Sequence, residues 1–364
     1  MKIAQKILLA QLSSPDNSST HCNVDTSAHI FFLVIHTLMF LVGLLLNGFT
    51  LKVYFCRAQQ KVSSSMTIYL KNLAAADFMI SLCLPIRIVN YASSSVSIRR
   101  VYCNFGAVAF YLNMYASILF MGYIAANRYL KIVRPLETHI LQTVRAAHII
   151  STMTWVFLLA TISTYVTLLL LTQEPLSSVP SAVNCDVLHS KQLSILYKII
   201  HTCSLVVFLL VLVSLVFFYY STTRRLSLAQ QRLPASSTSN KLAKSRRNML
   251  VLVIVFCVCF LPYHLVRLPY TFLRRSCSQS QGFFYLKELT IMLSVLNVCL
   301  DPLIYFIFCK AFRAQLSLRK VFSTTQGATQ GANTERRCSD GRMSTNQFNR
   351  KMSLTTTTKQ ISVL

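Results

Sequence analysis

An apolar stretch at residues 248–273 carries ionisable side chains whose spacing suits the binding of an anion. His264 and Arg267 are three residues apart, so they share one face of a helix, with Phe260 and Thr271 extending it. An ionised group at membrane depth costs about 2.5 to 3.5 kcal/mol, so polar groups that converge there indicate a functional pocket. The alternative is that Arg267 extends to the lipid headgroups while His264 bonds a neighbouring helix.

Two further residues of this stretch bear on its function. Tyr270 would add an aromatic contact to a ligand. Pro262 frees backbone carbonyls, which predicts a hinge beneath the pocket.

The whole chain has the composition of a membrane protein. Its 364 residues are 54% hydrophobic and 13% charged, with a mean hydropathy of +0.51, too apolar for a soluble domain of this length. We predict an all-α membrane protein, a bundle of seven transmembrane helices. The predicted spans are Ile30–Phe55, Met66–Tyr91, Tyr102–Ile132, Ala147–Leu171, Ile195–Tyr220, Asn248–Leu273 and Phe283–Phe308.

Lysine and arginine predict the orientation, because they collect in cytoplasmic loops. They are concentrated after spans one, three and five and in the C-terminal tail, so we expect a plasma membrane protein with an external N-terminus. The Asn17 glycosylation sequon agrees with that orientation. The predicted regions are an extracellular N-terminus (1–28), a transmembrane domain (29–309), an amphipathic interfacial helix (310–322) and a disordered cytoplasmic tail (323–364).

Charge and motifs exclude several classes of function. The net charge of +26 lies mainly in membrane-flanking loops and the tail, which indicates anionic lipid of the bilayer as its counterpart and no nucleic acid polymer. The sequence has no cysteine pairs with zinc spacing, no glycine-rich phosphate loop and no nucleophile elbow, so nothing argues for an enzyme. An ion-coupled transporter is disfavoured because the chain has eight glycines and no visible repeat.

Four of the twelve cysteines are expected to face the oxidising exterior. They precede or open spans one, three, five and seven, and three connectivities are possible. The expected bridges are Cys103–Cys185 and Cys22–Cys277.

Polar and proline motifs recur through the spans in a fixed order. They are Asn47 in span one, Leu73-Ala74-Ala75-Ala76-Asp77 in span two, Cys103 and Asn127-Arg128-Tyr129 in span three, Trp155 in span four, Cys259-Phe260-Leu261-Pro262 in span six and Asp301-Pro302-Leu303-Ile304-Tyr305 in span seven. Over about residues 28–322 this order resembles the rhodopsin-like (class A) G-protein-coupled receptors. The resemblance implies a receptor that binds an extracellular ligand and activates a heterotrimeric G protein.

A polar network is expected in the middle of the bundle, and two buried carboxylates there need a cation or shared protons. The resemblance implies an allosteric sodium ion, held by Asp77 and Ser117 with help from the others and released on activation; no other cofactor or metal is expected. The alternative is a hydrogen-bonded network without an ion. The members are Asp77, Asn113, Ser117, Asn297 and Asp301.

Arg128 closes span three, and the resemblance implies that it contacts the G protein once span six moves outward. Most relatives place an acidic residue before this arginine, whereas this chain has Asn127, so the carboxylate that would pair with Arg128 at rest is missing. Either basal signalling is raised, or Asn127 and Tyr219 hold Arg128 through neutral hydrogen bonds. The other expected switch residues are Tyr129, Phe260, Pro262 and Tyr305.

Within the family, segments 69–72, 110–115, 259–271, 287–288 and 297–302 resemble the purinergic nucleotide receptors of the ADP and UDP-sugar branch. Arg267 and Lys287 would clamp the phosphates, because desolvated phosphate requires charge-assisted bonds. Without an anion, Glu288 would pair with Arg267 instead. The expected ligand-binding residues are Tyr111, Tyr115, His201, His264, Arg267, Tyr270, Lys287 and Glu288.

Departures from that branch keep a phospholipid mediator as an alternative ligand. Asn127 and His201 resemble the platelet-activating-factor receptor, and segment 83–87 resembles lysophosphatidylserine receptors. A lipid requires an apolar channel between helices, whereas a nucleotide requires a closed polar cup. An orphan receptor with raised basal activity is the remaining interpretation.

The resemblance also implies cytoplasmic partners. Relatives in the nucleotide branch mostly couple to G proteins of the inhibitory class, and a phosphorylated tail would recruit an arrestin. The C-terminal residues Ser362-Val363-Leu364 could add a strand to a PDZ domain.

Weak restraint of Arg128 predicts signalling without ligand. Membranes that contain the protein should catalyse nucleotide exchange on a G protein faster than membranes that lack it. Exchange at the background rate would show that Arg128 is restrained despite Asn127.

Overall fold

The computed structural model describes residues 29–57, 64–93, 95–134, 139–172, 185, 190–231, 237–272 and 277–308, all within one compact unit. Seven helical spans in these ranges are long and apolar enough to cross a membrane, which confirms the predicted seven-helix membrane bundle. Asn17, Cys22, the interfacial helix at 310–322 and the tail lie outside the described residues. So does the side chain of Cys277, and with it the second expected bridge.

Five spans are single helices, and spans three and seven are composite. Span three begins at Val96, earlier than predicted, because a short helix and a π-helical turn continue directly into α5. Span seven is divided at Leu296 between α9 and α10. The elements are α2 (His29–Arg57), α3 (Ser65–Ala92), α4 (Val96–Val101), η1 (Tyr102–Gly106), α5 (Ala107–Val133), η2 (Ile140–Gln142), α6 (Val144–Leu171), α7 (Lys191–Gln231), α8 (Ser237–Phe272), α9 (Cys277–Val295) and α10 (Asn297–Phe308).

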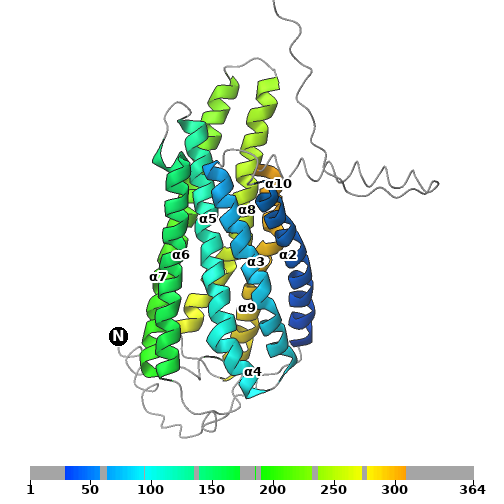
Figure 1. Cartoon of the computed structure of the whole chain (residues 1–364), viewed down its shortest axis with the longest axis vertical. Helices are drawn as coiled ribbons and strands as arrows, with labels where there is room; N and C mark the ends of the chain where they lie inside the picture. The colour runs from blue at the N-terminus through cyan, green and yellow to red at the C-terminus, as the bar shows by residue number, and fades with distance from the viewer. Residues whose placement is uncertain are drawn as a thin grey trace, which may run out of the picture. The chain divides into compact units, whose positions relative to one another are not determined.

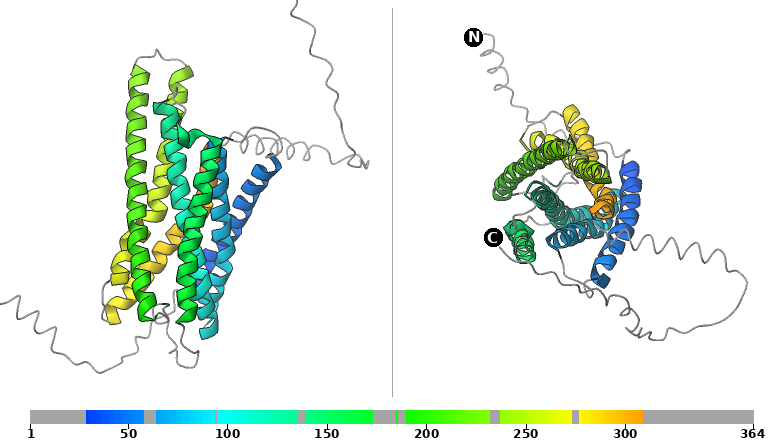
Figure 2. Two further views of the ribbon diagram at one scale, coloured as in Figure 1. Left: turned by 60° about the vertical axis from the view of Figure 1, so that its left-hand side comes forward. Right: turned by 90° about the horizontal axis from the view of Figure 1, so that it is seen from above.

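Helix α5 is the centre of the bundle. It contacts α3, α6, α7 and α8, whereas α2 packs at one side against α3 and α10 (Figures 1 and 2). The ends of α7 and α8 extend beyond the other helices at the top of Figure 1. Since every helix turns apolar side chains both to its neighbours and to lipid, specific polar contacts must select which faces meet.

Two motif residues make such contacts between helices. Pro302 has no N–H, so the carbonyl of Val298 one turn earlier lacks its usual helical donor. The Asn47 side chain of α2 donates to that carbonyl at 2.8 Å. Trp155 of α6 donates its indole N–H to the side-chain oxygen of Asn72 in α3 at 2.9 Å. These bonds attach α2 to α10 and α6 to α3.

The buried apolar residues form two separate clusters. The larger one runs through α2, α3, α5, α7, α8, α9 and α10 and includes Leu158 of α6. The smaller one joins α5, α6 and α7 around Tyr165, Leu169 and Leu193, with Ile162 packed against it. The helices α6 and α7 contribute residues to both clusters.

Gly43 allows α2 to approach α3 and α10 closely. A methyl group added at Gly43 would lie 2.7 Å from the Ser81 hydroxyl and 2.8 Å from Val298, whereas one added at Gly48 would meet nothing nearer than 3.5 Å. We expect Gly43→Ala to destabilise the protein by about 1–3 kcal/mol through overpacking. Gly48→Ala, the same change on the same helix, should be neutral or stabilising. Thermal unfolding of the purified protein checks this, and equal midpoints for the two variants would contradict the close approach.

Candidate ligand-binding site

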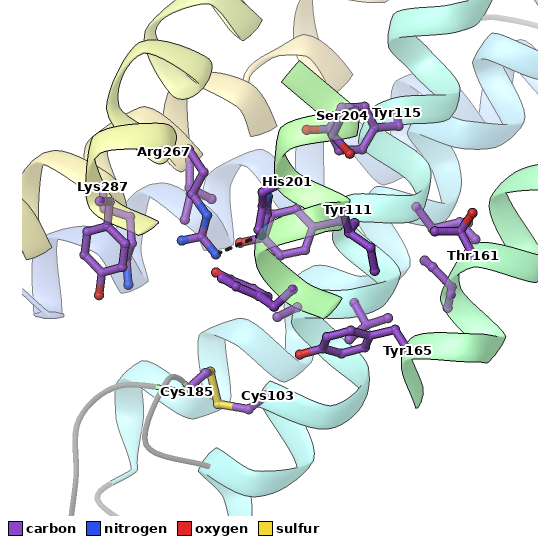
Figure 3. A pocket seen from close by; sticks show the side chains of 18 of the residues that line it. Cys103, Tyr111, Tyr115, Thr161, Tyr165, Cys185, His201, Ser204, Arg267 and Lys287 are labelled. Carbon is purple, nitrogen blue, oxygen red and sulfur yellow. Dashed lines mark hydrogen bonds between the residues drawn. A yellow bond between two sulfur atoms is a disulfide. The ribbon is translucent and has the colours of Figure 1, made fainter. Parts of the chain in front are cut away.

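A cavity of about 350 Å³ lies at the end of the bundle that carries the Cys103–Cys185 disulfide (Figure 3). This disulfide is the first of the two expected bridges, and it is confirmed. Residues of α3, α5, α6, α7, α8 and α9 contribute to the wall. The predicted ligand-binding residues that line the cavity are Tyr111, Tyr115, His201, Arg267, Tyr270, Lys287 and Glu288.

Arg267 is surrounded by aromatic rings from three helices. Its guanidinium carbon lies 5.5 Å from the ring centroid of Tyr111, 5.3 Å from that of Tyr197 and 5.5 Å from that of Tyr270. A guanidinium nitrogen lies 3.5 Å from Nε2 of His201. Each cation–π contact is worth up to about 2 kcal/mol when desolvated. With only 8% of the residue exposed, Arg267 does not extend to the headgroups, so that part of the alternative is wrong. Its other part, a bond from His264 to a neighbouring helix, is seen with Tyr115 of α5.

Lys287 approaches the same aromatic surface from α9. Its ammonium lies 4.9 Å from the ring centroid of Tyr270 and 4.9 Å from that of Phe284, and 3.2 Å from an oxygen of Glu288. The Tyr270 ring therefore has both Arg267 and Lys287 beside it. In Figure 3 the two cations point into one part of the cavity. This arrangement suits an anion held from two sides by charge-assisted bonds.

Glu288 pairs with Arg87 of α3, not with Arg267, so the partner that the sequence suggested is wrong. The Arg87 guanidinium donates to a Glu288 oxygen, to Tyr91 at 3.0 and 3.1 Å, and to Tyr102 at 2.7 Å. The Tyr91 hydroxyl donates to the same Glu288 oxygen. The side chains of Arg87 and Glu288 are 5% and 7% exposed, so this ion pair is deeply buried.

His264 lies beneath the cavity and does not form part of its wall, although the sequence predicted a ligand contact there. Its ring stacks on Phe208, with centroids 3.8 Å apart, and its Nε2 lies 3.2 Å from the Tyr115 hydroxyl. Its Nδ1 lies 2.8 Å from the Phe260 carbonyl. His264 and Arg267 share a face of α8, but three residues correspond to about 4.5 Å along the helix axis. His264 therefore lies deeper in the membrane than Arg267. His264 instead supports Tyr115 from below.

Ser117 and Asn297 of the predicted polar network bind Asp77 directly, whereas the Asn113 amide donates to the carbonyl of Ala109 in its own helix. The Asp77 carboxylate accepts hydrogen bonds from Ser117 at 3.1 Å, Asn297 at 3.3 Å and Tyr305 at 2.5 Å. Buried oxygens of Asn113, Asn297 and Asp301 accept no hydrogen bond from the described residues. Oxygen ligands are the ones that hard cations prefer, so this set fits a sodium ion held by Asp77, Ser117 and these oxygens. Tyr305, predicted as a switch residue, belongs to the same network.

Arg128 is held by the end of span seven. Its guanidinium carbon lies 4.4 Å from the Phe308 ring centroid, and a guanidinium nitrogen lies 3.4 Å from the Phe308 carbonyl. The Asn127 side chain instead donates to Ser65 at 2.9 Å and to the Leu141 carbonyl at 3.1 Å. The suggested restraint of Arg128 by Asn127 is therefore wrong, and no contact with the partly buried Tyr219 is seen among the described residues. Tyr129 stacks on Phe218, with centroids 4.9 Å apart.

The sequence of the chain matches a known family. The 7 transmembrane receptor (rhodopsin family) pattern covers residues 46–305, from Leu46 to Tyr305. The chain belongs to that family. Purinoceptor 14 of Bos taurus is 35% identical over 288 residues, which are 78% of this chain and 83% of that protein. Purinoceptor 13 of Homo sapiens is 32% identical, covering 88% of this chain and 90% of that protein. G-protein coupled receptor 87 of Mus musculus is also 32% identical, covering 88% of each.

These similarities make the receptor a class A G-protein-coupled receptor of the purinoceptor branch, as its motifs suggested. It is a multi-pass plasma membrane protein of a family without enzymatic activity, and it has an extracellular ligand and a G protein as partners.

Arg87 and Tyr197 are among the residues at the receptor's site that were not predicted. Arg87 had a signal, because an arginine in the middle of an apolar span is a functional candidate by itself. Tyr197 lies four residues before His201, one turn away on α7, and the two rings are 4.3 Å apart. Spacing from His201 would therefore have placed Tyr197 beside Arg267.

We expect the loss of one partner of the Arg87–Glu288 ion pair to destabilise the protein more than the replacement of both. Glu288→Leu leaves a buried guanidinium without its carboxylate, which should cost about 3–5 kcal/mol of stability. The double variant Arg87→Met with Glu288→Leu should recover most of that loss, because an apolar pair of similar volume is often nearly neutral. Thermal unfolding and cell-surface expression measure both effects. A double variant that is no more stable than Glu288→Leu would contradict this account.

Proposed function

We propose that the receptor binds an extracellular nucleotide or nucleotide sugar and activates a heterotrimeric G protein of the inhibitory class. The observation that carries this proposal is the position of Arg267 and Lys287 beside the same ring, Tyr270, in one cavity. Phosphate oxygens are recognised by such cations, and an aromatic ring offers a surface for a base. The relatives that are named purinoceptors support a purine nucleotide.

The external N-terminus and the sodium ion complete the proposal. With the N-terminus outside, the disulfide end and its cavity face the extracellular solution, where a nucleotide would be encountered. A sodium ion held near Asp77 would stabilise the resting packing of α3, α5 and α10, and its release would accompany activation. Arrestin and a PDZ protein are proposed to bind the tail, which lies outside the described residues.

One observation favours a phospholipid mediator as a second candidate. The walls that α6 and α7 contribute to the cavity are largely apolar, with Leu158, Ile162, Ile200 and Val207 among them. A closed polar cup for a nucleotide does not require such walls.

The clamp predicts a specific pattern of responses to ligands. Cells that express the receptor are exposed to ADP, UDP-glucose, lysophosphatidylserine and platelet-activating factor, and calcium or cyclic AMP is recorded. Arg267→Ala and Lys287→Ala should each weaken the response to the active ligand about 10- to 150-fold, because a hydrogen bond to a charged group is worth about 1.5–3 kcal/mol.

The matched control is Arg100→Ala, which removes a cation from α4 that does not line the cavity. Its response should equal that of the parent. If some ligand activates the parent and both clamp variants respond equally well, the clamp is wrong. Activity of a phospholipid but of neither nucleotide would select the second candidate.

A further inference from the structure

The cavity extends well beyond the cations. Figure 3 shows Lys287 on one side of Arg267 and His201, and Thr161 and Tyr165 of α6 on the other side. We call this second part the α6–α7 arm. We define it by ten residues that line the cavity: Leu112, Leu119, Phe157, Leu158, Thr161, Ile162, Ile199, Ile200, Cys203 and Val207.

The α6–α7 arm offers little to a polar ligand. Among the described residues that line the cavity from α6 and α7, there is no Asp, Glu, Lys or Arg, and Tyr165, Tyr197, His201 and Ser204, which do bring polar atoms to it, are not part of the arm as defined. The Thr161 hydroxyl donates to the Phe157 carbonyl of its own helix at 3.0 Å, so it is already satisfied. A nucleotide gains no charge-assisted bond here, whereas burial of apolar groups is favourable.

The arm also reaches the outer surface of the bundle. Phe157 and Ile199 line the cavity, yet 63% and 53% of their surfaces are exposed. Both lie within membrane-spanning helices, so the surface they expose faces the bilayer.

We propose that the α6–α7 arm is a binding subsite for one alkyl chain, so that the receptor accepts an anionic amphiphile whose phosphate lies at Arg267 and Lys287. The inference rests on the proposed phosphate site, with which the arm is continuous. Cations at one end and an apolar, bilayer-facing wall at the other complement a ligand with one phosphate and one chain. The arm runs from Ile199 to Val207 on α7, about 12 Å of helix.

Alkyl phosphates of different length test the subsite directly. The full-length receptor in nanodiscs is titrated with butyl phosphate and octyl phosphate, and its thermal unfolding midpoint is recorded. Each buried methylene contributes about 0.8 kcal/mol, or about a fourfold change in affinity. We therefore expect octyl phosphate to stabilise the receptor at concentrations at least about tenfold lower than butyl phosphate.

Two isoleucines on one face of α7 supply matched variants. Ile199 lines the arm, whereas Ile195, one turn away and 55% exposed, does not. Ile199→Trp should abolish the advantage of octyl phosphate and leave the effect of butyl phosphate unchanged, while Ile195→Trp should behave like the parent. Cys203→Phe narrows the arm from a second position, with the exposed Thr202→Phe as its control.

The outcomes separate this inference from the proposed function. An equal effect of both alkyl phosphates on the parent, or a chain-length advantage that persists in both arm variants, overturns the alkyl subsite.

ADP is titrated in parallel. If ADP stabilises the parent while chain length has no effect, the nucleotide proposal stands and the subsite fails. If ADP has no effect while octyl phosphate binds through the arm, the nucleotide proposal fails and the subsite stands.

Discussion

A charge buried in a membrane bundle must find its partner inside the bundle, and this requirement determines which helices meet. Apolar packing alone does not determine which helices become neighbours, because an apolar helix face can contact lipid chains as favourably as it contacts another helix. Arg87 and Glu288 join α3 to α9 at the ligand end. Asp77 receives hydrogen bonds from α5 and α10 at mid-depth. Arg128 attaches α5 to α10 at the opposite end. These polar contacts occur at successive depths, and the apolar clusters fill the volume between them.

The spans and motifs could be predicted because their signals are local. Twenty or more apolar residues in a row specify a membrane helix with few alternatives, and all seven predicted spans are confirmed. The start of span three was misplaced because α4 is short and carries Arg99 and Arg100, which lower its apolar signal. The division of span seven at Leu296 has no clear signal either, because Pro302, the nearest proline, lies six residues further on.

The site was predicted in part, and the errors have a common cause. Arg267, Lys287 and Tyr111 were identified from residue type and family motif, and they line one cavity. The partner of Glu288 is 201 residues away along the chain, and no spacing rule connects residues of different helices. His264 was placed on the correct face but at the wrong depth. Faces of a helix are encoded by periodicity, whereas depth and partners depend on how helices pack against one another.

The division of span seven at Leu296 separates two segments with different contacts. The segment α9 carries Lys287 at the cavity, and α10 carries Phe308 at Arg128. A ligand that draws Lys287 toward Arg267 acts on one segment, and a transducer that displaces Phe308 from Arg128 acts on the other. If binding at one end changes the contacts at the other end through this span, the two binding free energies are coupled, and such coupling is reciprocal. A ligand that raises the affinity for the G protein by some factor then has its own affinity raised by the same factor when the G protein binds.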